Sequence, residues 1–410
     1  MKSLILILVY SFVYQFIHVN FLYKVFYYAG YIAEDFSLIS LLQTLFFILI
    51  PLKLKKRVSS DFFLEVLYTI TYFLLYIPLM ITFLNHYKGF WLIIDAQIPF
   101  LIGYLVLFGI PCFKKISVVK FNLNPPKISM LVFSVFLIVG YLYIVNKEIY
   151  GFVSFEDVYS QREKGISRSI ISGYFTLWLT YFFGPIIVSI GLANKSIVTI
   201  VIGIVSVIFV YGINASKIAL FIPFLIIFFF LIKKSKQDVL DSVAVLFSAI
   251  CIVTYLLPEQ FNMISAVILM RTFGIPGLLT FQYLEFFKTN PQTYFSHINL
   301  INFFTDSYPY KQDLGFVVSS FFFESDNNAN ANFWATDGIA SLGKLGIVFI
   351  SIIFGFYLLY VKSMTTSKNS LILGLLFVSF AFIVLNVGFF TSLMSGGFLL
   401  LSVYLHVFKS

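Results

Sequence analysis

The stretch ISMLVFSVFLIVGYLYIV, residues 128–145, contains no charged side chain. Its length approaches the roughly 20 apolar residues that cross a bilayer as a helix. Similar apolar runs occupy residues 4–19 and 370–385. Across the 410 residues, 60% are hydrophobic, and the mean hydropathy of +0.97 is too high for a water-soluble fold. We therefore expect one all-α, polytopic membrane domain over residues 1–410.

Apolar runs separated by polar turns predict about twelve transmembrane helices. The first run has no small-residue cleavage site after it, so we interpret it as an uncleaved helix rather than a signal peptide. The predicted spans are 3–21, 36–52, 62–84, 90–113, 128–146, 174–193, 196–212, 217–232, 240–257, 341–361, 369–386 and 389–407.

The net charge of +9 comes mainly from lysines in short loops between the apolar runs. These basic loops include residues 53–57, 114–127, 233–236 and 362–368, and they alternate with the predicted spans. This is the positive-inside pattern of membrane proteins, and it does not indicate a nucleic-acid partner. It predicts a multi-pass membrane protein in which these loops and both termini are cytoplasmic.

Two longer loops fall on the opposite, external side, at about 147–173 and 258–340. The second loop contains helix-breaking residues near 274–277, 290–291, 308–309 and 327–332. Its apolar stretches at 263–271, 277–287 and 314–323 predict short amphipathic or re-entrant helices. A long polar loop in a membrane protein is a favoured place for a binding or catalytic site.

Basic side chains in these loops are candidates for binding an anion. Arg162 and Arg168 lie in the first loop, and Arg271 ends an apolar run in the second. A guanidinium binds phosphate through two parallel hydrogen bonds. The alternatives are that Arg162 forms an ion pair on the loop surface, and that Arg271 and Lys217 extend to the membrane interface.

Three patches of sequence carry a resemblance to a known family. Arg162 is followed after ten residues by Gly173, whereas Arg271 lacks a glycine at that spacing. The segments Asn214-Ala215-Ser216-Lys217 and Ala335-Thr336-Asp337-Gly338 also match in character. With its two external loops, the chain resembles the Wzy-type O-antigen polymerases, also called oligosaccharide repeat-unit polymerases.

The resemblance implies a metal-independent glycosyltransferase without a cofactor. Such enzymes transfer a growing oligosaccharide from undecaprenyl diphosphate to a second lipid-linked repeat unit, at the outer face of the cytoplasmic membrane. The products are O-antigen, capsular or exopolysaccharide chains. Membrane lipid and a chain-length regulator protein are the other expected partners. Arg162 and Arg271 would stabilise the charge that develops on the departing diphosphate.

A general base would accept the proton of the attacking sugar hydroxyl. The candidates are His297, the only histidine of the long loop, and Asp306, Asp313, Glu324 and Asp337. His297 and Asp337 are assigned to catalysis with the two arginines. An ordinary hydrogen-bonded loop histidine is the alternative. Six residues are assigned to substrate binding because charged and aromatic side chains hold sugars and phosphates: Tyr159, Arg168, Lys217, Asp306, Glu324 and Trp334.

Two other functions fit the same architecture. An O-antigen ligase uses the same lipid-linked donor with a different acceptor, and His297 keeps this alternative open. A flippase or transporter of the lipid-linked oligosaccharide would need ionisable residues within its helices. Nearly all charges here lie at the ends of spans or in loops, with Asp95 the main exception.

Overall fold

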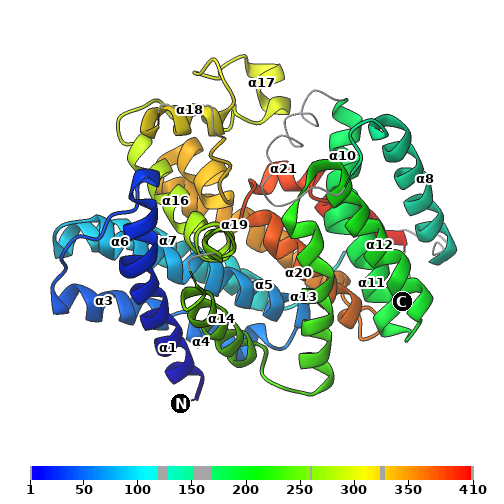
Figure 1. The fold of residues 1–410 in the computed structure, drawn as a ribbon, viewed down its shortest axis with the longest axis horizontal. Helices are drawn as coiled ribbons and strands as arrows, with labels where there is room; N and C mark the ends of the chain where they lie inside the picture. The colour runs from blue at the N-terminus through cyan, green and yellow to red at the C-terminus, as the bar shows by residue number, and fades with distance from the viewer. Residues whose placement is uncertain (1, 119–127, 152–168, 259–260, 324–327, 408–410) are drawn as a thin grey trace.

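The computed structural model of the protein describes residues 2–118, 128–151, 169–258, 261–323 and 328–407. These residues form helices and no strands, which confirms the all-α prediction (Figure 1). The first half contains α1 (Lys2–Ile17), η1 (His18–Leu22), α2 (Tyr23–Phe26), η2 (Tyr27–Ala29), α3 (Leu38–Leu49), α4 (Leu52–Val58), α5 (Phe62–Thr71), η3 (Tyr72–Tyr76), α6 (Ile77–His86), α7 (Phe90–Gly109), η4 (Ile110–Cys112), α8 (Ile128–Asn146), α10 (Ile170–Trp178), η5 (Leu179–Phe183) and α11 (Gly184–Ala193).

The second half is also helical. It contains α12 (Ile197–Asn214), α13 (Lys217–Lys234), α14 (Val239–Tyr255), α15 (Asn262–Ser265), η7 (Ala266–Gly274), α16 (Ile275–Phe286), α17 (Asn299–Thr305), α18 (Leu314–Phe322), η8 (Trp334–Ile339), α19 (Ala340–Met364), α20 (Ser370–Val384), α21 (Phe389–Met394) and α22 (Phe398–Val407).

Within the described residues, nine helical segments are long and apolar enough to cross a membrane. This finding supports a multi-pass membrane protein, but it does not confirm the count of twelve. The segments are Lys2–Ala29, Leu38–Val58, Phe62–His86, Phe90–Cys112, Ile128–Asn146, Ile170–Ala193, Ile197–Asn214, Met263–Phe286 and Trp334–Met364.

The segment Met263–Phe286 differs from the prediction, which placed a break at residues 274–277. The helix instead continues from η7 into α16. Pro276 lies at the start of α16, directly after the π-helical segment η7, whose shifted hydrogen bonds accommodate the missing N–H of the proline. The two short helices expected here are therefore one continuous apolar helix.

The last predicted span, 389–407, is not one helix. It is divided into α21 and α22, and Gly397 between them has a φ of +91°. A side chain is strained in this region of φ, so the turn favours glycine. The predicted spans at 240–257 and 369–386 are shorter helices than expected, α14 and α20.

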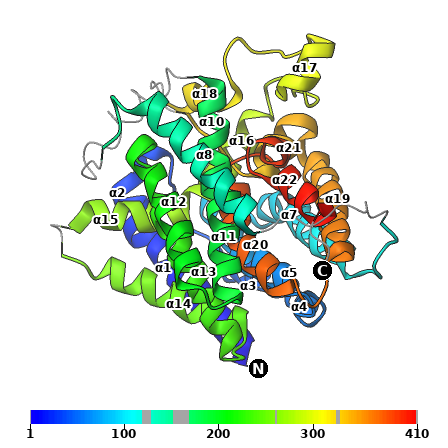
Figure 2. The same cartoon turned by 90° about the vertical axis from the view of Figure 1, so that its right-hand side faces the viewer.

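The centre of the bundle is the helix formed by α5, η3 and α6. Every residue in its most apolar stretch is buried, whereas α1, α3 and α8 expose much of their surface. In both views α20 lies beside α5 (Figures 1 and 2), and α16, α3 and α7 pack against α6. A wholly buried apolar helix is typical of the middle of a multi-helix bundle.

Ion pairs group the loops at two ends of the bundle. At one end, Lys55 binds Asp238 and Asp241 with N–O distances of 2.7 and 3.3 Å, and Lys2 lies 3.8 Å from Asp241. Three segments predicted to be on the same side therefore meet there, at the bottom of Figure 1. At the other end, Lys88 binds Glu34 at 2.9 Å, which joins the loop between the first and second predicted spans to the loop between the third and fourth.

Candidate functional site

A re-entrant segment, residues 328–343, carries Asp337 into the bundle. Asn332 anchors it: the side-chain amide donates to Pro276 O (3.2 Å) and Thr280 Oγ1 (2.6 Å), and its oxygen accepts from the backbone N–H of Trp334 and Ala335. The Asn332 side chain is fully buried, so these bonds satisfy groups that apolar surroundings would otherwise leave unpaired.

The re-entrant segment then turns back on α19. The chain leaves helical geometry at Leu342 and at Gly343, whose φ is +57°. Beyond the break, Gly346 packs against Gly338, and a β-carbon at Gly346 would lie 2.0 Å from the carbonyl oxygen of Gly338. This backbone-to-backbone contact requires glycine and fixes η8, and with it Asp337, beside the start of the long part of α19.

His297 reaches the same place from the segment that follows α16. Thr293 N donates to Ala340 O at 2.7 Å, and Tyr294 N donates to Ser341 O at 3.3 Å. Tyr294 and Phe295 have φ values of +46° and +67°, which are strained for residues with side chains. Two strained residues, separated from His297 only by Ser296, indicate that this turn is held by its surroundings to position the imidazole.

His297 and Asp337 form a closely held pair. Nε2 of His297 lies 3.2 Å from Oδ1 of Asp337, and the two side chains are only 8% and 1% exposed. The second carboxylate oxygen, Oδ2, accepts from the backbone N–H of Phe390 at 3.0 Å. Gly388 leaves room for this arrangement, because a β-carbon there would lie 2.5 Å from Oδ1.

The hydrogen bonds around His297 determine where its protons lie. Thr293 Oγ1 donates to Ala340 O at 3.0 Å, so it accepts from Nδ1–H of His297 at 2.9 Å. With Nδ1 protonated, Nε2 faces Oδ1 of Asp337, and a proton that the pair takes up can be shared between these two atoms. The pair can therefore accept or release a proton while its heavy atoms stay in place, which is what a general base needs.

The pair faces a cavity of about 400 Å³. Its lining includes four ionisable residues, His297, Lys311, Asp313 and Asp337. The remainder is rich in amide and hydroxyl groups, from Ser296, Asn299, Asn302, Gln312, Asn328, Asn330, Thr336, Asn386 and Thr391, with tyrosines 283, 308 and 310. Such a lining suits a hydroxyl-rich ligand, because each group can donate or accept a hydrogen bond.

Two of the lining tyrosines are neutral hydrogen-bonding groups rather than bases. Burial, together with the nearby Asp313 carboxylate, raises the pKa of Tyr308, and burial raises the pKa of Tyr310. Their hydroxyls donate to backbone carbonyls, Tyr308 to Gln312 O at 3.0 Å and Tyr310 to Pro291 O at 2.5 Å. His297 and Asp337 are therefore better placed than these phenols to accept a proton.

The structure brings together only part of the predicted site. His297, Asp313 and Asp337 line the cavity, whereas Asp306 is exposed at the C-terminal end of α17. Trp334 is fully buried, and its Nε1 donates to Ser351 Oγ at 2.9 Å, so it does not reach the cavity. Four predicted residues, Tyr159, Arg162, Arg168 and Glu324, lie outside the described residues.

The two remaining basic candidates lie on other helices. Arg271 is an exposed residue of η7, and Lys217 is the half-buried first residue of α13. Neither lines the cavity. The structure thus joins the acid–base candidates but does not bring these two cations to them.

Three residues of the site were not predicted. Lys311 lines the cavity. It is a basic residue of a predicted external loop, the property for which Arg162 was predicted to bind an anion. Gly388 lies in the short turn between two predicted spans, on the predicted external side. Thr293 lies four residues before His297, and only the fold reveals its hydrogen bond. Among the described residues, no group of three His, Cys, Asp or Glu side chains could hold a metal ion.

No protein-family model, curated protein or solved structure matches this chain.

Proposed function

We propose that the protein is a membrane glycan polymerase. It transfers a growing oligosaccharide from undecaprenyl diphosphate to a second lipid-linked repeat unit, at the outer face of a bacterial cytoplasmic membrane. The observation that carries the proposal is the His297–Asp337 pair, joined at 3.2 Å and opening on a polar cavity. A buried acid–base pair beside a cavity rich in hydrogen-bonding groups is suited to activating a sugar hydroxyl.

In the proposed reaction, the cavity holds the terminal sugar of the acceptor unit. Its attacking hydroxyl gives a proton to the His297–Asp337 pair as its oxygen forms a bond to the anomeric carbon of the donor. The bond from that carbon to the diphosphate breaks, and the electron pair stays on the diphosphate oxygen. A general base of this kind contributes about 10²–10⁴-fold to a reaction rate.

Cations are needed for the departing diphosphate, which gains negative charge as the bond breaks. Lys311 is on the cavity lining, where an ammonium can neutralise an anion that enters. The resemblance assigns the same role to Arg162 and Arg271, but Arg271 lies in the helix Met263–Phe286 and does not line the cavity. The proposed partners are donor and acceptor lipid-linked oligosaccharides, membrane lipid and a chain-length regulator protein.

The same pair favours one second candidate, an O-antigen ligase. A ligase would use His297 and Asp337 in the same way and differ only in the acceptor, which would be a lipid A core. A flippase has less support, because the cavity residues His297, Lys311 and Asp313 follow α16 on a loop rather than lining a path between helices.

Deletion of the gene in its native bacterium separates these functions. For a polymerase, we expect surface glycan of single repeat units, since flipping and ligation continue. Glycan chain length is read from a gel of the extracted lipopolysaccharide or lipid carrier. Polymer that accumulates on the lipid carrier would indicate a ligase, and a complete lack of surface units would indicate a flippase; either result contradicts the polymerase.

A further inference from the structure

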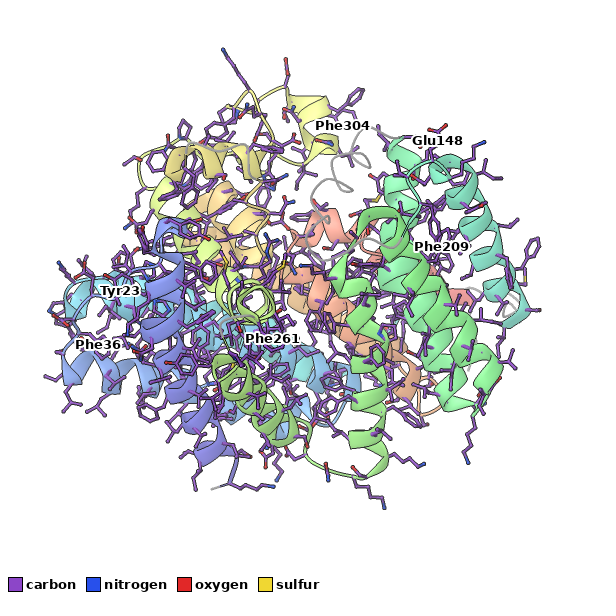
Figure 3. All side chains as sticks on the ribbon, in the orientation of Figure 1. Tyr23, Phe36, Glu148, Phe209, Phe261 and Phe304 are labelled. Atoms are coloured by element: carbon purple, nitrogen blue, oxygen red, sulfur yellow. The ribbon has the colours of Figure 1, made fainter. Side chains whose placement is uncertain are left out.

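The short helix α17 has two unlike faces. Asn299 and Asn302, three residues apart on one side of the helix, line the polar cavity. Leu300, Phe303 and Phe304 are 70%, 82% and 78% exposed, and their spacing places them together on a second side. Figure 3 shows Phe304 at the outer edge of the protein, beside α17. The helix therefore separates a polar cavity from an apolar surface.

The segment that leads into α17 contacts the exposed apolar side of α19. Leu345 and Phe349 are 79% and 44% exposed on that helix, one turn apart, as expected of side chains that contact lipid. The ring of Phe295 lies 5.8 Å from the ring of Phe349. Tyr294, 68% exposed, adjoins Phe295. Exposed apolar side chains thus occur on α19, at Tyr294 and on α17, which begins four residues after Phe295.

The surface changes character immediately after α17. Asp306 follows the helix with a φ of +45°, and Ser307 and Lys311 are also exposed. A group of three large apolar side chains that borders exposed polar residues is typical of a helix lying at a membrane interface. Water would not favour such a group, whereas the hydrocarbon expected around the exposed apolar side of α19 would.

We propose that α17 docks on the bilayer leaflet at this end of the bundle. Leu300, Phe303 and Phe304 contact the hydrocarbon, and Asn299 and Asn302 face the cavity. The occupant of the apolar face is therefore membrane lipid. One consequence rests on the proposed function: a lipid-linked sugar can place its head group in the cavity while its chain stays in the leaflet, with only α17 between them.

Spin-label accessibility tests this docking without measuring activity. Cys112 and Cys251, the only cysteines, are first replaced by alanine. Single cysteines are then introduced as Phe303→Cys, Leu345→Cys as the lipid-facing control and Ser307→Cys as the water-facing control. Each variant is labelled with a nitroxide and reconstituted in phospholipid nanodiscs. Collision rates are measured with oxygen, which concentrates in lipid, and with a nickel chelate, which stays in water.

We expect the oxygen-to-nickel ratio at position 303 to match that at 345 and to be several-fold higher than that at 307. A ratio equal to that at 307 would overturn the proposal, because α17 would then lie in water. Low collision rates with both reagents would also overturn it, because protein would cover the face. If Phe303→Cys does not yield a monodisperse protein, Leu300→Cys is measured with the same expectations.

Discussion

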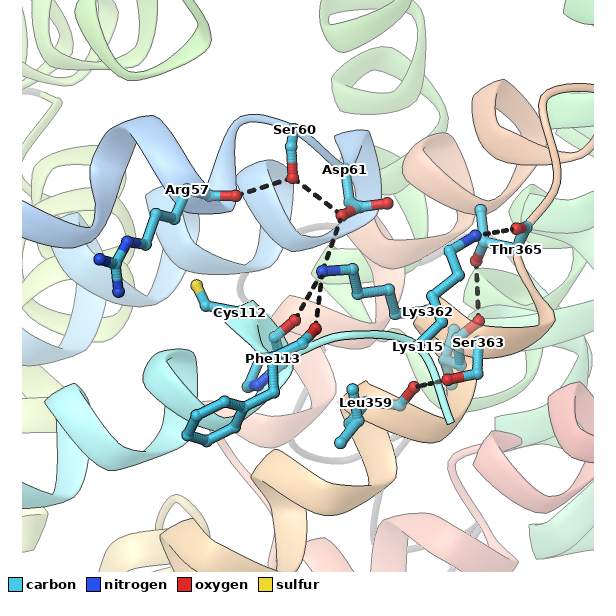
Figure 4. Close-up of polar contacts among 12 residues, drawn as sticks. Arg57, Ser60, Asp61, Cys112, Phe113, Lys115, Leu359, Lys362, Ser363 and Thr365 are labelled. Atoms are coloured by element: carbon cyan, nitrogen blue, oxygen red, sulfur yellow. Dashed lines mark hydrogen bonds and ion pairs between the residues drawn. The ribbon is translucent and has the colours of Figure 1, made fainter. Parts of the chain in front are cut away.

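The two ends of α19 both join a carboxylate to a basic side chain, yet they differ in what surrounds the pair. At the far end, Lys362 lies 3.6 Å from Asp61 and donates to Pro111 O at 2.9 Å and Phe113 O at 3.3 Å (Figure 4). Protein oxygens thus occupy all three directions in which the ammonium can donate. At the near end, His297 and Asp337 have protein partners too, but they also line a cavity.

The difference separates a structural ion pair from a candidate catalytic one. Around Lys362, further bonds close the site: Ser60 Oγ donates to Asp61 at 3.0 Å, and Lys115 donates to Thr365 O at 2.6 Å (Figure 4). These contacts tie α4, η4 and the end of α19 together. Both pairs are largely buried, so an accessible cavity is the property that identifies a site of chemistry.

The largest effect should come from removing the carboxylate of the near-end pair. Asp337→Asn keeps the size of the side chain and can still accept from Phe390 N–H, but it cannot hold a proton with His297. We expect polymer formation to fall about 10²–10⁴-fold at an unchanged protein level. Polymer is measured by gel and protein by immunoblot. Normal polymer would show that Asp337 has no catalytic role.

The second effect concerns the anchor that holds Asp337 in position. Asn332→Leu removes four hydrogen bonds inside the bundle and leaves buried partners unsatisfied, at about 1–3 kcal/mol for each group. We expect the folded protein to be lost or its melting temperature to fall sharply, measured in detergent. Asn290→Leu, in a half-buried loop position, is the matched control and should change little. Equal stability of the two variants would contradict the anchoring role.

A smaller effect is expected at the far end of α19. Lys362→Met leaves Asp61 without its cation and two carbonyls without a donor. The loss of stability should be about 1–2 kcal/mol, since the pair is partly exposed. Lys368→Met, at an exposed position, should have no effect. Polymer formed per folded molecule should be unchanged in both variants. A fall in that ratio for Lys362→Met would mean that the two ends are coupled.

The sequence predicted the helical membrane architecture because an apolar run long enough to span a bilayer has few alternatives to a helix. It did not predict the continuous helix Met263–Phe286, since Pro276 is accommodated by a π-helical turn that composition does not reveal. His297 and Asp337 were selected one by one, as polar residues of an external loop. Their contact depends on the approach of Gly338 to Gly346, which is set by packing between helices.

The cations were the least predictable part of the site. Arg271 is a candidate because a charged residue is rare in an apolar run. The sequence does not show on which side of the helix this residue lies, and therefore whether it reaches the cavity. Lys311 lies in a polar stretch where a lysine is ordinary, yet it lines the cavity. The hydroxyls of Tyr308 and Tyr310 donate to backbone carbonyls and so hold the loop around Lys311. The sequence alone does not show which carbonyls accept these hydrogen bonds.

The most direct test of the account is the reaction of the purified protein with its proposed substrate. The wild-type protein and Asp337→Asn are reconstituted in liposomes with an undecaprenyl-diphosphate-linked repeat unit, and products are separated by mass spectrometry. The account predicts that wild-type protein forms a lipid-linked chain of two or more units and one undecaprenyl diphosphate for each bond made, and that the variant forms almost none. Equal product from the two proteins, or none from either while both bind the substrate, would contradict it.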